Sequence, residues 1–216
     1  MTTWFHGTPD VRPLRDAGGF TPRFRTQRLV TDGDKLRELS ARRSDPEVSG
    51  ADFRRLSKEM EACWEEVDAP VPVFLSATRA TARSYADETR AFRENEADPA
   101  VLEAVCDAPA EVTIDARGAS FRGVTWPDVA AGLAASDLEA EEVRRTVFDR
   151  LPDVRDRIRV EHLGFALWTA GARVVDVENV VDTHGGTGRP DTVRMVFDPE
   201  LVRLPGLEAA PGTPEP

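Results

Sequence analysis

The segment Trp4-Phe5-His6-Gly7-Thr8 places a histidine at the end of a short apolar run and a glycine directly after it. An imidazole in this position can offer its ring and nearby backbone groups to a flat polar ligand, and glycine allows such a ligand to approach the backbone closely. A single histidine of this kind is more often a structural residue. A binding role for His6 therefore depends on the residues that accompany it.

A second run, Val73-Phe74-Leu75-Ser76-Ala77-Thr78, ends in small hydroxyl residues and leads into an alanine-rich helical pattern that carries Tyr85. Gly18-Gly19-Phe20 lies between the two runs. This spacing of a His-Gly strand, a glycine pair and a hydroxyl-ended strand favours a ligand-binding role for His6.

The other histidines and the cysteines lack the spacing of a metal site. We expect His162, in a helical pattern, to be a core or surface residue and His184 to lie in a flexible glycine-rich loop. That loop lacks the lysine of a phosphate-binding P-loop. Cys63 and Cys106 fall in predicted helices without CxxC spacing, so we predict two core thiols, with neither a metal site nor a disulfide.

Periodicity and turn residues predict the elements that must position these side chains. Strands are predicted over residues 3–8, 71–76, 111–115, 173–180 and 192–197. Helices are predicted over residues 34–67, 77–92 and 99–106, and a last helix is predicted to end near Gly171. In the first, one face carries Phe53, Leu56, Met60, Cys63 and Val67. A further helix is predicted to follow a capping box of Ser136 and Glu139, with Val143, Val147 and Leu151 on one face.

The composition is that of a soluble globular protein, with 40% hydrophobic and 31% charged residues among 216. We predict one domain over residues 1–204, with a helical insertion at 30–70 and a disordered tail at 205–216. The net charge of −11 argues against a nucleic-acid-coating surface. The arginines between Arg12 and Arg28 are expected to form a solvated face in preference to a polyanion site. No apolar run has membrane-spanning length and no signal-peptide pattern opens the chain, so we expect a cytoplasmic protein without a membrane partner.

The order of these blocks resembles the ADP-ribosyltransferase superfamily, whose first strand carries His-Gly-Thr or His-Gly-Ser and whose second ends in Tyr-Leu-Thr or a similar run. Phe74-Leu75-Ser76-Ala77-Thr78 looks like the corresponding stretch of the rifampicin ADP-ribosyltransferases. Three further blocks resemble transferase-like domains in polyvalent proteins of phages and mobile elements: residues 111–115 followed by 126–128, residues 171–182, and residues 189–199. Residues 30–70 lie outside the resemblance.

The resemblance implies an α+β fold, with an ADP-ribosyltransferase-like split β-sheet core and flanking helices, and NAD as the substrate. His6 would hold the ribose and carboxamide side of NAD, with Gly7 and Thr8 completing a backbone clamp. Phe74 would stand where the family has a nicotinamide-stacking tyrosine, a role that needs only a ring face. Ser76 and Tyr85 would complete the NAD-binding residues.

The same resemblance calls for a carboxylate at the start of the last strand, where it would steady the oxocarbenium-like charge as nicotinamide leaves. No glutamate is present there, which leaves Asp191 and, on the adjacent strand, Glu178 as candidates.

Two functions stay open at this point. One is a mono-ADP-ribosyltransferase that passes ADP-ribose to an unknown protein, nucleic-acid or small-molecule acceptor, in phage–host conflict or as a toxin. The other is a catalytically inactive module that binds NAD, another nucleotide or a protein. The acidic composition disfavours a third, an RNA-phosphate-processing relative of the same fold.

Overall fold

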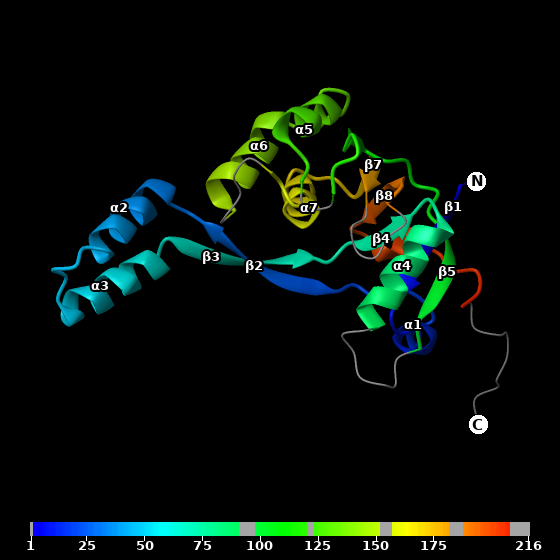
Figure 1. Cartoon of the computed structure of the whole chain (residues 1–216), viewed down its shortest axis with the longest axis horizontal. Helices are drawn as coiled ribbons and strands as arrows, with labels where there is room; N and C mark the ends of the chain where they lie inside the picture. Colours follow the sequence, from blue (N-terminus) through cyan, green and yellow to red (C-terminus); the bar gives the residue numbers. More distant parts are fainter. Residues whose placement is uncertain (1, 91–97, 121–122, 152–156, 182–187, 208–216) are drawn as a thin grey trace.

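The computed structural model describes residues 2–90, 98–120, 123–151, 157–181 and 188–207 and combines one mixed sheet with flanking helices, which confirms the predicted α+β class (Figure 1). The six strands of the sheet follow the order β5-β1-β4-β8-β7-β6. Their bounds are β1 Thr3–Thr8, β4 Val73–Ser76, β5 Ala100–Val105, β6 Val112–Asp115, β7 Val174–Val181 and β8 Pro190–Val196. All neighbours are antiparallel except β6 and β7, which are parallel.

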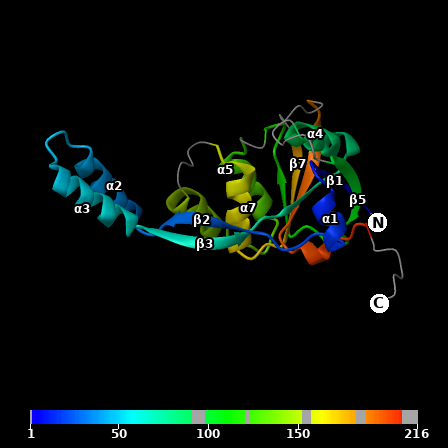
Figure 2. The ribbon, with the colours of Figure 1, turned by 90° about the horizontal axis from the view of Figure 1, so that it is seen from below.

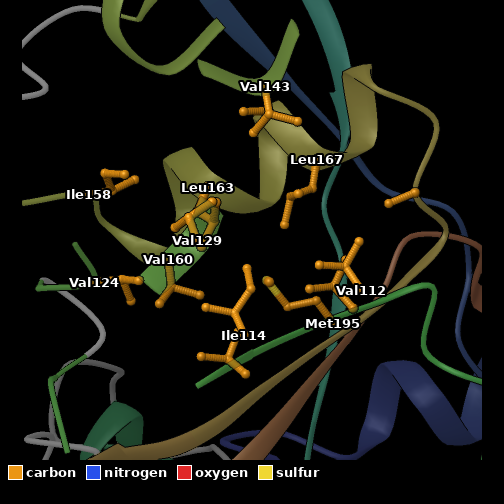
Figure 3. Packing of buried hydrophobic residues seen from close by; sticks show 14 of the residues in the cluster. Val112, Ile114, Val124, Val129, Val143, Ile158, Val160, Leu163, Leu167 and Met195 are labelled. Carbon is orange, nitrogen blue, oxygen red and sulfur yellow. The ribbon is translucent and has the colours of Figure 1, made fainter. Parts of the chain in front are cut away.

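One face of the sheet, which we call the helical face, is covered by most of the core helices. These are α4 Arg79–Arg90 over β1 and β5, and α5 Trp126–Leu133, α6 Ala140–Arg145, the π-helix η1 Thr146–Arg150 and α7 Val160–Thr169 over the other half. Side chains alternate between the two faces of a strand, so Ile114 and Met195 both point toward this face. Figure 3 shows them packed against Leu163 and Leu167 of α7. Fully burying each such side chain contributes about 2 kcal/mol.

The opposite face is covered by α1 Arg12–Ala17, the segment around Phe20 and the last described residues, including the 3₁₀ helix η2 Pro199–Leu201. Arg194 lies on this face and is mostly buried. Its guanidinium bonds both oxygens of Asp176, at 2.7 and 2.8 Å, and lies 4.3 Å from the Trp4 ring. Burial opposes the charge on Arg194, but the hydrogen bonds and charge of Asp176 outweigh it and raise its pKa.

A long arm projects from the core (Figures 1 and 2). It consists of a two-stranded antiparallel ribbon, β2 Phe24–Val30 and β3 Trp64–Pro70, which carries a helical hairpin, α2 Gly33–Arg43 and α3 Gly50–Glu61. Asp32 and Ser49 cap the two helices by accepting hydrogen bonds from backbone N–H groups in their first turns. The hairpin has a small core of its own.

The chain departs from the predicted elements in the arm and at the edge of the sheet. The helix predicted over residues 34–67 is wrong at 44–49, which separate α2 from α3, and beyond Glu61, because Val67 lies in strand β3, which pairs with β2. Phe53, expected on the packed face, is exposed. The helix predicted over 99–106 is also wrong: Ala100–Val105 is strand β5, and its ladder with β1 overrides the helix propensity of alanine, leucine and glutamate.

The predicted capping box is wrong as well, because the Ser136 hydroxyl donates to the Leu133 carbonyl and Glu139 makes no side-chain cap. Val143, Val147 and Leu151 are nevertheless buried as predicted. Cys63 and Cys106 are buried free thiols, as expected, but neither lies in a helix. Residues 91–97, 182–187 and 208–216 are outside the described part, and with them Phe92, His184 and most of the predicted tail.

Candidate functional site

Strands β1 and β4 are hydrogen-bonded neighbours, and this pairing brings the His-Gly run beside the Phe-Leu-Ser run. Phe5 pairs with Ser76. His6 Nδ1 lies 2.9 Å from the carbonyl oxygen of Phe74, a residue 68 positions away in the chain. The two sequence runs that carry the family resemblance therefore meet at one point of the sheet.

The His6 imidazole is neutral at neutral pH. Burial lowers its pKa, and the hydrogen bond to the Phe74 carbonyl offsets that effect only in part. Because a carbonyl oxygen only accepts, Nδ1 must carry the proton, which leaves Nε2 as an acceptor. The ring also packs edge-on against Phe20, with ring centroids 4.8 Å apart. The imidazole is thus held on two sides.

Gly7 and Thr8 are engaged within the protein itself. A Cβ atom at Gly7 would lie 1.9 Å from the Ala82 carbonyl oxygen, so the glycine lets α4 pack directly on β1. The Thr8 hydroxyl donates to the Asp10 carbonyl at 2.8 Å and closes the turn after the strand. We predicted that a ligand would approach the backbone closely at Gly7, but helix α4 makes that approach instead.

The side chains of His6 and Phe74 lie on opposite faces of the sheet. Phe74 and Ser76 share the helical face, since Phe74 pairs with Met195, whose sulfur packs near Gly164 of α7. Phe5 pairs with Ser76 and shares its face, so His6, the next residue along β1, points to the opposite face, where its ring contacts Phe20. Tyr85 is on α4, which covers the helical face, and is 46% exposed.

The two candidate acids have different surroundings. Asp191 is buried, and its Oδ2 accepts from the Thr78 hydroxyl at 2.9 Å and from the Thr78 N–H at 3.4 Å. Its Oδ1 accepts from the Thr192 N–H at 2.8 Å. Asp191 therefore ties the start of β8 to the turn between β4 and α4, on the face that Ser76 shares.

Glu178 is exposed on β7, where it pairs in register with Asp115 of β6. A bulge follows it, in which Asn179 adopts a left-handed conformation with φ of 53° and donates to Asp115. Strand β8 separates β7 from β4. Of the two carboxylates, only Asp191 therefore adjoins the strand that carries Phe74 and Ser76.

Phe74 also lines a pocket of about 360 Å³ between the base of the arm and α7. The lining residues are Arg25, Gln27, Ala69, Pro70, Val71, Pro72, Phe74, Arg159, Glu161, His162, Phe165 and Phe197. His162, expected to be a core or surface residue, is part of this lining. The arginines between Arg12 and Arg28 are exposed, as predicted, and Arg25 among them also lines the pocket.

Comparison with models of protein families finds none that matches this chain, and searches of curated proteins and of solved structures likewise return no match. Within the described residues, no group of His, Cys, Asp and Glu side chains is placed to hold a metal ion. No helix in that part of the chain is both long and apolar enough to cross a membrane.

Proposed function

We propose that this chain is a mono-ADP-ribosyltransferase of the ADP-ribosyltransferase-like fold, with NAD as substrate. The observation that carries the proposal is the adjacency of β1 and β4, in which His6 is hydrogen-bonded to the carbonyl of Phe74. The resemblance to phage and mobile-element domains adds a role in phage–host conflict or as a toxin.

The geometry supports a division of roles around β4. Phe74 offers a ring face to nicotinamide on the helical face, with Ser76 two residues further along the same face. Asp191, tied to the next turn, supplies the anion that steadies the ribose as charge develops. His6, on the opposite face of the sheet, holds the Phe74 backbone through its carbonyl and therefore acts as a positioning residue.

In the reaction, the bond between ribose C1 and the nicotinamide nitrogen breaks and its electron pair leaves with nicotinamide. The acceptor nucleophile then forms a bond to C1 and gives up its proton. Asp191 contributes only charge to this step, so it needs no proton of its own.

Nicotinamide release from NAD by the purified protein tests the proposal, with a cell lysate as the source of acceptor. Phe74→Ala and His6→Ala should each reduce release at least tenfold, whereas Phe24→Ala, which removes an exposed ring at the arm, should leave it unchanged. Phe74→Tyr should preserve or raise activity, because it restores the family's residue. Release that is equal in all four variants would exclude this site.

The hydrogen bonds of Asp191 favour a second candidate, an inactive module that binds NAD or another nucleotide. This carboxylate already accepts three hydrogen bonds from the protein's own Thr78 and Thr192, so less of its negative charge is available to a ligand. NAD binding measured by calorimetry, together with no nicotinamide release under any acceptor condition, would support this candidate.

A further inference from the structure

The base of the arm is anchored on α7, and this contact builds one wall of the Phe74 pocket. Leu29 and Ala69 of the ribbon pack with Leu151 and Phe165 in one buried cluster. Figures 1 and 2 both show the ribbon passing beside α7. The wall therefore belongs to the anchored base of the arm, and the hairpin helices take no part in it.

Arg25 and Gln27 point toward α7 because of the strand register. They lie on the same face of β2 as Leu29, and Arg25 pairs with Ala69 across the ribbon. Since Leu29 and Ala69 are buried on that face, Arg25 and Gln27 face the pocket. Arg25 makes no ion pair with any residue described in the structure.

The start of α7 forms the facing wall, where Arg159 and Glu161 carry opposite charges. Arg159 and His162 line the pocket there, and Glu161 bonds Arg159 at 3.2 Å. With that pair formed, the charge of Arg25 remains uncompensated within the lining. The chain as a whole carries a net charge of −11, so a cationic pocket runs against its composition.

Aromatic rings complete the lining between these walls. Phe74, Phe165 and Phe197 line the pocket from β4, α7 and the position after β8, and the last two are each 7% exposed. Val71 adds an apolar side chain that is 40% exposed. Apolar walls with a few convergent polar groups are the usual make-up of a small-molecule site. Ring faces accept flat ligands by stacking, and arginine accepts phosphate or carboxylate through paired N–H groups.

We propose that this pocket binds a planar aromatic molecule that bears an anionic group, with its ring on the phenylalanines and its phosphate or carboxylate at Arg25. Binding of this kind does not require NAD cleavage. Where the proposed transferase activity holds, Phe74 places the pocket beside the nicotinamide, and the bound molecule is then the acceptor. That assignment rests on the proposed function.

Calorimetric titration without NAD tests the pocket, with adenosine 5′-monophosphate and adenosine as probes. Both probes contain the adenine ring and its ribose, and only the monophosphate carries a phosphate group. We expect the monophosphate to bind at least tenfold more tightly. Arg25→Gln should weaken monophosphate binding about tenfold, as for one charge-assisted hydrogen bond, and leave adenosine unchanged.

Two further variants separate charge from fold. Arg28→Gln changes an exposed arginine on the other face of the same strand and should leave both affinities unchanged. Val71→Asp places a negative charge in the exposed lining and should abolish monophosphate binding while adenosine still binds. Equal affinity for the two probes, no binding of the monophosphate at millimolar concentration, or an unchanged affinity in Arg25→Gln would overturn the proposal. Because NAD is absent, such a result would not bear on NAD cleavage.

Discussion

Asp191→Asn should destabilise the fold even when no ligand is present. The carboxylate accepts three hydrogen bonds, two from Thr78 and one from the Thr192 N–H. An amide offers one oxygen and turns an NH₂ group toward donors on the other side, so at least one backbone N–H loses its partner. Leaving such a buried donor unsatisfied costs about 1–3 kcal/mol. We expect the free energy of unfolding to fall by about 2 kcal/mol.

For a domain of this size that loss lowers Tm by about 6 °C. Urea unfolding followed by the fluorescence of the four tryptophans measures it. Thr78→Val removes the hydroxyl's contacts with Thr81 and its hydrogen bond to Asp191, and should cost about 1–2 kcal/mol. Because Thr78 and Asp191 share that bond, the double variant should fall short of the sum by about 1 kcal/mol. An Asp191→Asn protein as stable as the parent, or strictly additive losses, would refute the structural role of this carboxylate.

Three further predictions concern the sheet. Gly7→Ala should cost about 3 kcal/mol of stability without any ligand, because its methyl group would overlap the Ala82 carbonyl, whereas Gly50→Ala, with open space around it, should be neutral or slightly stabilising in the same unfolding assay. Asp176→Ala should cost about 3–5 kcal/mol by leaving the Arg194 guanidinium buried without its counter-charge, and Arg194→Met in the same chain should recover part of that loss in thermal melts. His6 has a lowered pKa in the fold, so the unfolded chain binds its proton first and stability should decline as the pH falls below about 6.5; His6→Gln should flatten the decline in a pH series of melts, and an unchanged slope would contradict the assignment.

The strands that the sequence predicted correctly share two local signals, a short run rich in β-branched or aromatic residues and a glycine or proline near one of its ends. Residues 3–8 and 173–180 have both, and they form β1 and most of β7. Strand β5 follows Pro99 but lacks the other signal, since Ala-Val-Leu-Glu-Ala-Val is equally compatible with a helix, and only its ladder with β1 makes it a strand. Long-range pairing of this kind cannot be seen in a local window.

The candidate site was predictable to the level of strands but not of faces. The block order anticipated that His6 and Phe74 would meet, and they do, through a backbone carbonyl. Which face each ring occupies depends on a register of one residue, since a shift by one reverses every side chain of a strand. The pocket forms only because the ribbon of β2 and β3 packs against α7. The sequence therefore could not predict that Arg25 and Arg159 line the same pocket.

The ribbon also makes the helical hairpin of α2 and α3 a unit that can be replaced without changing the main sheet. The hairpin is joined to the rest of the chain through the cross-strand pair Val30 and Trp64, beyond which the Thr31 N–H donates to the Cys63 carbonyl at 2.9 Å. The chain leaves and re-enters at the same place, so the order of strands in the main sheet does not depend on what lies between these residues. Exchanging α2 and α3 for a two-residue turn would shorten the chain while keeping Leu29, Ala69 and Arg25 in register. The hairpin can therefore differ in length and charge while the base of the arm, the core and the Phe74 pocket keep their architecture.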